Sequence, residues 1–455
     1  MRKILLVTDR FYHFETNLLP IARKLYERYG VSSVLLMFKN PPDFINKFKT
    51  LKDIPFISLE DKDSGSSLHP THSKQDNCDN SPRIRPIWLK ALSVIPKRMR
   101  SVGRSRRIAR ELLDTVQLSA IIFQKGNKEE VPFLVKLART RGIKTVAIQT
   151  NPDAIYRYHG KQTKRWNGKE ILQTLLRYGL HFIDCIAYAV LLTPINFFDL
   201  RHHWTKGNVD LFCIENEWFR QGYIKNGCSP DKIVVTGSPE ADSFLAEHKN
   251  FTPEAKAKKR KSLKTLDGEP VLLLVMTNGK HFNQTERIIR RERIEELLAF
   301  ININHPTLKI WLSVHPQEDQ CDYKIFQQSF KRIQVVGDAS FSLFLSSDIV
   351  ITEGSTSIFL AQWINKPSAI YNMLTPDAEG WHAARASYNY KTTLLDNPTS
   401  VSCWIDKDLN NNFDKCGLDW SYCQDGRACE RIADLTLLGQ DGCAHSETKD
   451  GCGIA

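Results

Sequence analysis

"DIVITEGSTSIFLAQWINKP", residues 348–367, carries the pattern from which the fold class can be inferred. An apolar run at 349–351 predicts a short buried strand. An acid, a glycine and a Ser-Thr-Ser run follow at 353–357, and a helical pattern then continues to Asn365-Lys366-Pro367. A buried strand, a polar turn and a helix in this order form part of a βαβ unit. The segment therefore predicts an α/β protein with a parallel sheet.

The hydroxyl residues at 355–357 have two interpretations. Serine and threonine are preferred helix N-caps, because their oxygens accept hydrogen bonds from backbone N–H groups left unpaired in the first turn. A helix N-terminus after a parallel strand is also an anion site, with N–H donors and the positive end of the helix dipole. One hydroxyl is enough for capping, so the whole run beside a glycine favours phosphate or nucleotide binding.

Composition is that of a globular protein with an anionic partner. The chain has 455 residues, 42% hydrophobic and 25% charged, which suits two large domains or about three smaller ones. The net charge of +12 favours a nucleotide, a nucleic acid or an acidic membrane surface as partner.

The 11 cysteines contain no CxxC pair, which argues against a disulfide framework and a zinc site. A reducing, cytoplasmic compartment fits best. The apolar run at 4–7 is too short for a signal peptide.

Strand and helix patterns alternate in two series separated by a charged stretch. The first series predicts strands at 3–8, 33–38, 120–123, 145–149, 209–214 and 233–236, with helices at 17–29 and 131–141. The second predicts strands at 271–276, 308–314, 333–336, 349–351 and 368–371, and a closing helix at 425–439. Such alternation is typical of α/β chains with doubly wound, Rossmann-like domains. We predict domains at 1–247 and 266–440, a linker at 248–265 and a disordered tail at 441–455.

Three further segments stand out in the first domain. Residues 61–86 are rich in Ser, Asp, Asn and Pro and predict a flexible insertion. The basic stretch near 98–110 is either a solvated helix face or a patch for RNA or membrane. Residues 175–198 are the most apolar in the chain, but they contain charged residues and a proline, so they make a poor spanning helix. They are either an interfacial helix on an anionic membrane or a buried helix between the domains.

Small polar residues come directly after successive strands of the second series. Open parallel sheets bind ligands at the carboxyl ends of their strands, so these residues are expected on one edge. They are Thr277, Asn278 and Gly279; then His315, Pro316 and Gln317; then Gly337 and Asp338; and then Glu353 to Ser357.

Two motifs carry a resemblance to a known family. The motif "SVHPQED" at 313–319 and "SSDIVITEGSTSIFLAQWINKP" at 346–367 resemble the carboxyl-terminal half of GT-B nucleotide-sugar enzymes. "VVTGSPEAD" at 234–242 matches the turn that closes their first domain. Similar patterns occur in bacterial capsule glycosyltransferases, CDP-glycerol glycerophosphotransferases and UDP-N-acetylglucosamine 2-epimerases. The resemblance covers residues 206–438 well and the first 200 residues only as pattern.

The resemblance implies a role for each donor-site residue. His315 would contact the donor phosphate as an imidazolium, and Glu353 would accept hydrogen bonds from ribose hydroxyls. The hydroxyl run would supply donors where the leaving phosphate gathers charge. The implied donor-binding residues are Thr277, Asn278, Gly279, His315, Pro316, Glu353, Gly354, Ser355, Thr356 and Ser357. The nucleotide-activated donor is a substrate, and no further cofactor is expected.

The catalytic base has several candidates. In the resembling transferases it comes from the first domain, because it must reach the acceptor hydroxyl. The counterpart loop "FQKGNKEE" lacks an acid before its glycine, so the candidates are Glu129 and Glu130 in that loop and His13 and Glu15 after the first strand. His13 is preferred. No DxD motif stands out as a metal site, and no metal is expected.

The resulting hypothesis is a GT-B glycosyltransferase of surface polysaccharide or lipid-linked glycan assembly, in the cytoplasm or on the inner membrane face. It would move a sugar or polyol phosphate from a nucleotide donor to an acceptor hydroxyl. A UDP-N-acetylhexosamine 2-epimerase or hydrolase is the first alternative. It is weaker because the epimerases carry Asp-Ser-Gly-Gly and then an acid pair, where this chain has Leu360-Ala361-Gln362. A non-enzymatic nucleic-acid binder is the second alternative, and it leaves the His-Pro and hydroxyl motifs unexplained.

Overall fold

The computed structural model of the chain describes most of both predicted domains. The described residues are 3–8, 14–37, 56–58, 107, 109–124, 130–149, 209–225, 228–279, 282, 284–337, 340–353, 355, 357–373, 393–409 and 421–438. Several predicted features lie outside them: His13, Glu129, Gly354, Thr356, the insertion at 61–86, the apolar segment at 175–198 and the tail at 441–455.

The first sheet is parallel and doubly wound. Within the described residues its strands follow the order β3-β2-β1-β4-β5-β6-β7. They are β1 (Lys3–Thr8), β2 (Ser32–Met37), β3 (Phe56–Ser58), β4 (Leu118–Gln124), β5 (Lys144–Ile148), β6 (Leu211–Ile214) and β7 (Ile233–Val235). The strand order reverses between β1 and β4, which makes the carboxyl ends of these two strands the switch point of the sheet.

The second sheet repeats this plan. Its described strands follow the order β10-β9-β8-β11-β12-β13, all parallel. They are β8 (Val271–Val275), β9 (Lys309–Ser313), β10 (Ile333–Val336), β11 (Ile349–Thr352), β12 (Ser368–Tyr371) and β13 (Thr393–Leu395). Here the order reverses between β8 and β11. Two doubly wound α/β sheets were predicted, and the structure confirms them; β3 and β13 were not predicted.

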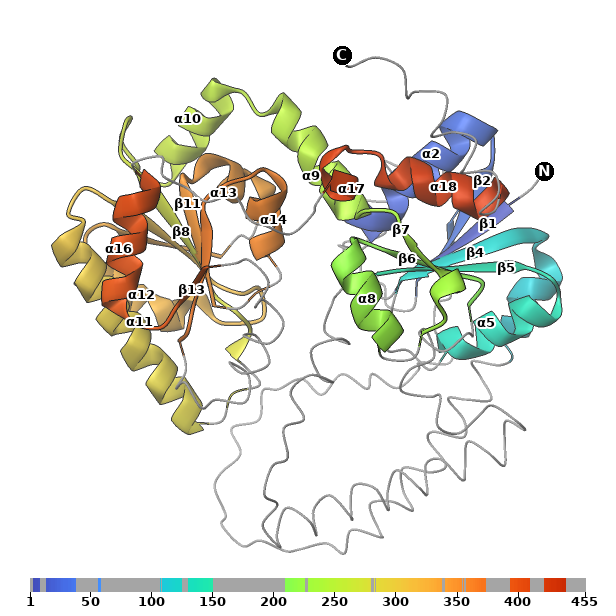
Figure 1. Ribbon diagram of the computed structural model, residues 1–455, viewed down its shortest axis with the longest axis horizontal. Coiled ribbons are helices and arrows are strands. Elements are labelled where there is room, and N and C mark those ends of the chain that lie inside the picture. Colours follow the sequence, from blue (N-terminus) through green and yellow to red (C-terminus); the bar gives the residue numbers. More distant parts are fainter. Residues whose placement is uncertain are drawn as a thin grey trace, which may run out of the picture.

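Helices cover both sheets (Figure 1). Those around the first sheet are η1 (Phe14–Leu18), α2 (Leu19–Tyr29), α5 (Glu130–Thr140), α8 (Glu217–Lys225), η3 (Pro230–Lys232) and α9 (Pro239–Asn250). The second series is α10 (Pro253–Ser262), α11 (Gln284–Asn304), η5 (Gln320–Tyr323), α12 (Lys324–Ser329), α13 (Phe341–Ser346), α14 (Ile358–Trp363) and α16 (Pro398–Leu409). The chain continues with α17 (Ser421–Gln424) and α18 (Ala428–Leu438).

The central strands form because they are apolar on both faces. Every residue of β8 (VLLLV), β9 (KIWLS) and β11 (IVIT) is buried. Strands covered by helices on both sides read as continuous Val/Ile/Leu runs rather than as alternating ones. This is why the sequence pattern located these strands to within a residue or two.

Helix α18 returns from the second sheet to the first. Its residues Cys429, Ile432 and Leu435 are buried in one cluster with the β1 residues Ile4 and Leu6. Figure 1 shows α18 beside α2, on the side of the molecule that carries β1 and β4. The expected second domain, 266–440, therefore differs from the structure at its end, because residues 421–438 pack on the first domain.

The predicted linker also has more structure than expected. Residues 248–265 contain the end of α9 and all of α10, whose Arg260 is buried. The Arg260 guanidinium binds both carboxylate oxygens of Asp348 at 2.7 Å, which fastens α10 to the start of β11. A helix with one buried cation has no apolar stripe, so its packing left no hydrophobic pattern in the sequence.

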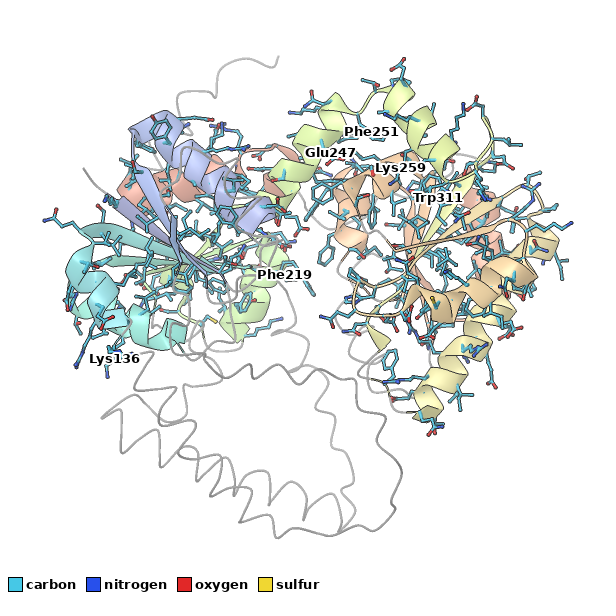
Figure 2. All side chains as sticks on the ribbon, turned by 180° about the vertical axis from the view of Figure 1, so that it is seen from behind. Lys136, Phe219, Glu247, Phe251, Lys259 and Trp311 are labelled. Carbon is cyan, nitrogen blue, oxygen red and sulfur yellow. The ribbon has the colours of Figure 1, made fainter. Side chains whose placement is uncertain are left out.

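Aromatic rings join the two halves of the molecule. Phe219 of α8 packs edge-on against Phe359 of α14 with centroids 6.0 Å apart. Phe244 of α9 packs against Phe341 at 5.0 Å and lies near Trp363 at 6.3 Å. Figure 2 shows Phe219 at the side of its domain that faces the other one. The two sheets thus share one hydrophobic cluster across the contact.

Candidate functional site

The loops after β8 and β11 meet at the switch point of the second sheet. The strands pair in register through Val275 and Thr352, so Thr277 and Glu353 emerge side by side. The backbone N–H and the hydroxyl of Thr277 donate to Glu353 Oε2 at 3.1 and 2.9 Å. Ligands of doubly wound sheets bind in the crevice at this position. The first and fourth predicted loops are therefore brought together here.

Arg290 of α11 ties these loops to the loop after β9. Its Nε and Nη2 donate to the two oxygens of Glu353, each at 2.7 Å, and Nη1 donates to Glu318 Oε1 at 2.9 Å. Nη2 also donates to the carbonyl of Thr277 at 2.9 Å. Tyr323 accepts from Nη1 and donates to Glu318 Oε2. One guanidinium thus holds three edge loops in a fixed arrangement.

The cluster is a buried charge network. Arg290 is 4% exposed, and the side chains of Glu353 and Glu318 are 5% and 11% exposed. Burial alone lowers the pKa of the Arg290 guanidinium, but the two carboxylates outweigh it and the pKa rises well above its ordinary value. For the neutral acid Tyr323, burial has the opposite effect and raises the pKa of the hydroxyl. The arginine is therefore a permanent cation beneath the edge of the sheet.

Glu353 has partners that the sequence did not predict. It was expected to accept hydrogen bonds from a ribose, whereas in the structure Arg290 and Thr277 occupy its two oxygens. Its observed contacts hold the β8 and β11 loops together. A contact between Glu353 and a ribose stays a prediction.

Gly279 is required by this packing. Its backbone N–H donates to Glu318 Oε1 at 3.1 Å, and a Cβ at this position would overlap Arg290 Nη1 and that same carboxylate oxygen. The neighbouring Asn278 Nδ2 donates to Gln317 Oε1 at 2.6 Å, which links the β8 and β9 loops at the surface. Thr277, Asn278 and Gly279 therefore lie where the sequence placed them, beside the His-Pro loop.

His315 is oriented by its own loop. Its Nδ1 accepts a hydrogen bond from the backbone N–H of Gln317 at 3.1 Å, and the following Pro316 is exposed. A nitrogen that accepts from an N–H carries no proton, so the ring proton belongs on Nε2. This geometry favours a neutral imidazole that donates through Nε2, in place of the imidazolium expected from the sequence.

Ser355 and Ser357 bond to each other at the start of α14. Ser357 occupies the N-cap position without a side-chain capping bond. Its hydroxyl donates to Ser355 Oγ at 2.8 Å, and Ser355 Oγ also accepts from the Ser357 N–H at 3.3 Å. Ser355 therefore stabilises its own turn, and both hydroxyls lie after β11, beside the Arg290 network. Ser355 thus accepts a backbone N–H at the start of the first turn, so the capping interpretation keeps support beside the phosphate one.

Amide side chains lie at the carboxyl edge of the first sheet, where a carboxylate was expected as the catalytic base. Thr8 donates to Gln124 Oε1 at 3.2 Å across the β1–β4 switch point. Gln149 after β5 is buried, and its Oε1 accepts from the N–H of Glu215 after β6. Of the four base candidates proposed for the first domain, the side chain of Glu15 alone is described, and it is exposed on η1.

Glu215 is a buried carboxyl that sequence reasoning missed. Burial, with a smaller contribution from Glu240, raises the pKa of its side chain to about 8, so the carboxyl is protonated at neutral pH. Gln149 Nε2, Asn216 Nδ2 and Glu215 Oε2 have no hydrogen-bond partner among the described residues. Because Asn216 Oδ1 accepts from the Phe219 N–H, the amide of Asn216 has a fixed orientation.

Arg290 also escaped the sequence analysis, although a signal was present. The buried residues of α11 are Arg290, Ile294, Leu297, Leu298 and Ile301. An arginine that continues an apolar stripe at helical spacing must be paired when it is buried. Its partners are 63 and 28 positions away in the sequence, so the pattern indicates the burial and not the partners.

Comparison with solved structures places this arrangement among known folds. UDP-GlcNAc 2-epimerase from Methanocaldococcus jannaschii matches with a TM-score of 0.56 and 15% identity over 96% of this chain and 100% of that one. The Neisseria meningitidis enzyme, solved bound to UDP-GlcNAc, matches with a TM-score of 0.54 and 12% identity over 96% and 99%. Apo UGT2 of Phytolacca americana matches with a TM-score of 0.51 and 13% identity over 99% of both chains.

The chain has the GT-B fold. This confirms the fold class predicted from the sequence and, at the level of fold, the resemblance to GT-B enzymes. No protein-family model matches the chain, and no curated protein matches it in sequence. Among the described residues, no cluster of His, Cys, Asp and Glu has the arrangement of a metal site, and no helix is long and apolar enough to cross a membrane.

Proposed function

We propose that this GT-B chain is a glycosyltransferase that uses a nucleotide-activated donor. It moves a sugar or a polyol phosphate to a hydroxyl of a glycan or lipid-linked acceptor. The observation that carries the proposal is the convergence of the β8, β9 and β11 loops at the switch point of the second sheet. Arg290 holds these loops together.

The chemistry of that edge suits a phosphate-bearing ligand. Ser355 Oγ accepts from the Ser357 hydroxyl and keeps its own hydrogen, so Ser355 and a neutral imidazole of His315 are hydrogen-bond donors from two loops of the edge. Donors fixed before the reaction stabilise charge that gathers on a leaving phosphate. His315 and the serines are accordingly assigned to the phosphates, with Thr277 and Asn278 on the neighbouring loop.

The first domain favours transfer over epimerisation. A 2-epimerase needs several carboxylates at the sugar carbon. Among the described residues, Gln124 ends β4 and Gln149 comes just after β5, and neither amide can remove a proton from carbon. Leu360, Ala361 and Gln362 also stand where the epimerases carry an acid pair, and all three are buried in α14. The amides at these two strand ends and the lack of an acid pair at 360–362 support a transferase.

The epimerase or hydrolase is the second candidate. It is favoured by the solved structures, because several of the matching chains are UDP-GlcNAc 2-epimerases. That likeness rests on 15% identity or less, and the substitutions at 360–362 count against it.

A thermal-shift screen of nucleotides and nucleotide sugars tests the proposal. A ligand at 100 times its dissociation constant stabilises the folded state by about 2.7 kcal/mol, which is readily measured. The double variant Ser355→Ala/Ser357→Ala should still fold, with a melting temperature lowered by the lost turn bonds, and should lose most of the ligand-induced shift. Each hydrogen bond to a charged phosphate is worth roughly 1.5–3 kcal/mol. A screen in which no nucleotide shifts the melting temperature would remove the basis of the proposal.

Turnover of the donor then separates the two candidates. Incubation of the chain with UDP-N-acetylhexosamine alone should leave the donor intact. Epimer or free sugar formed without any acceptor would establish the second candidate and end the first. His315→Ala should lower turnover more than it raises the donor KM, because its bond strengthens as the phosphate leaves.

A further inference from the structure

A second charged surface lies at the amino ends of the second sheet, away from the edge that carries the candidate site. Lys258, Lys261 and Lys264 follow one another at intervals of three along and just after α10. All three are exposed, and none forms an ion pair with an acid among the described residues. Side chains three apart share one face of a helix. In Figure 1, α10 lies at the upper end of the second domain.

Lys264 occupies a strained position. Its φ is 53°, in the left-handed region. The Lys264 N–H donates to the carbonyl of Lys261, and the Thr265 N–H donates to that of Arg260, both at 3.0 Å. These two bonds define a Schellman C-cap, in which the left-handed residue is usually glycine. A lysine here costs free energy that glycine would avoid.

The strands beside the α10 turn extend the positive surface. The exposed Lys331 and then Arg332 come directly before β10, and Lys309 is the first residue of β9. Burial lowers the pKa of Lys309, and the nearby charges of Arg332 and Lys264 lower it further, against the opposite effect of Glu269. The mutual repulsion shows that these cations share one field.

The acidic groups of this region do not cancel that field. Glu269 is paired with Arg332 at 3.0 Å, and its second oxygen accepts from the backbone N–H of Leu266. Asp267 in the turn and Glu254 in the first turn of α10 are the other acids near these lysines; both are exposed, and the lysines outnumber them. The lysines of α10 therefore keep their charge facing the solvent.

Leu266 lies in the middle of the positive surface. It is 70% exposed, on a turn between Lys264 and Asp267. An exposed leucine offers nothing to a hydrated polyanion, but it can enter the boundary between lipid headgroups and acyl chains. Basic residues around an exposed apolar side chain are the composition of a surface that binds anionic membranes.

We propose that Lys258, Lys261, Lys264, Leu266 and Lys331, here called the basic face, dock the protein on an anionic lipid bilayer. The lysines contact lipid headgroups, and Leu266 inserts between them. The candidate site is at the opposite, carboxyl ends of the strands, so docking leaves it open to solvent. This inference is independent of the proposed glycosyl transfer, because vesicle binding requires no turnover.

Vesicle flotation with the full chain tests the basic face. The protein should float with vesicles that contain phosphatidylglycerol and remain at the bottom with pure phosphatidylcholine. Each lysine near an anionic surface contributes about fivefold to partitioning. The triple variant Lys258→Glu/Lys261→Glu/Lys264→Glu should therefore bind at least about 100-fold more weakly.

A matched control has the same change in net charge. Arg23→Glu/Lys136→Glu/Lys225→Glu reverses three exposed cations of the first domain. Figure 2 shows Lys136 at the outer end of that domain, far from Lys259 on α10. This control should float as the wild type does, and an equal loss in both triple variants would overturn the proposal.

Two single variants separate docking from stability and from polyanion binding. Lys264→Gly should raise the melting temperature and still weaken partitioning about fivefold. Leu266→Ser should weaken vesicle binding and leave binding to heparin unchanged. If Leu266→Ser floats normally while heparin displaces the protein from vesicles, the basic face binds soluble polyanions and the lipid assignment is wrong.

Discussion

Arg290 shows how much of the site depends on one side chain. A guanidinium presents five N–H donors in a planar fork, so it can bind two carboxylates and a carbonyl at once. Lysine, with a single nitrogen, cannot span Glu353, Glu318 and Thr277 in the same way. The loops of the edge therefore owe their arrangement to an arginine that hydrogen-bonds Glu353 and Thr277, two of the predicted donor-site residues.

Replacement of Arg290 tests this role. Arg290→Met leaves Glu353 and Glu318 buried without a cation, which costs about 3–5 kcal/mol of unfolding free energy. Chemical denaturation measures the loss. Arg291→Met is the matched control, because Arg291 is adjacent and exposed. Equal stability of the two variants would show that the network contributes nothing.

Glu215 makes stability depend on pH. The pKa of its carboxyl is about 8 in the folded state against an ordinary value of 4.5, so between these values the folded chain holds a proton that the unfolded chain has lost. Its contribution is fully present below about pH 4.5 and is lost as pH rises through 8. One pKa unit corresponds to about 1.4 kcal/mol, so the loss amounts to a few kcal/mol.

Denaturation of Glu215→Gln over the same pH range measures this effect. The amide cannot ionise, so the fall of stability from pH 5 to pH 8 should be shallower in the variant than in the wild type by roughly this amount. The variant should also be the more stable protein at pH 8. Parallel curves for the two proteins would mean that the carboxyl titrates normally.

Among the secondary-structure elements, α17 and α18 close on the turn between β7 and α9. The Asp242 carboxylate accepts from the N–H groups of Ala428 and Cys429 at 3.1 and 2.7 Å, so a residue of α9 caps α18. Arg431 donates to the carbonyls of Thr236 and Tyr422 at 2.8 and 2.6 Å. The motif at 234–242 therefore fastens the returning helix to the first domain.

Gly237 allows this close approach. Its φ is 83°, and a Cβ there would overlap the backbone carbonyl of Tyr422 in α17. Gly237→Ala should lower the unfolding free energy by about 1–2 kcal/mol for the left-handed strain, and by about 1–3 kcal/mol more for the overlap. Gly268→Ala is the control, because its φ is 81° and no atom lies within 4 Å of an added Cβ. If both variants lose the same stability, α17 does not pack on the turn as described.

In the molecule as a whole, the last helices belong to the first domain. A chain that ends at residue 420 lacks α17 and α18 and uncovers the face of the first domain that buries Ile432 and Leu435. Each of these side chains contributes roughly 1.5–3 kcal/mol when buried. Hydrogen exchange should accelerate in β1 and β4 and stay slow in β8 and β9. A chain that ends at Leu438 is the control, and faster exchange in both sheets would mean that α18 stabilises the molecule as a whole.

Local patterns in the sequence were enough to locate the central strands and the residues that follow them, although the short edge strands β3 and β13 were not predicted. Runs such as 271–275 and 349–352 are apolar throughout, and a strand covered on both faces needs no information from distant residues. Because parallel strands all end at one edge, the residues that come directly after each strand are neighbours in space. Thr277, His315 and Glu353 were located in this way.

The pairing of distant groups and the packing of the last helix required the folded chain. Arg290 and Glu353 are 63 positions apart, and Asp242 caps a helix 186 positions later. A helical pattern shows that one face is buried without naming the element that covers it. Hydrogen bonds and ion pairs depend on distances that folding sets. No local sequence pattern therefore identifies the partners of Arg290, the burial that keeps Glu215 protonated, or the domain on which α18 packs.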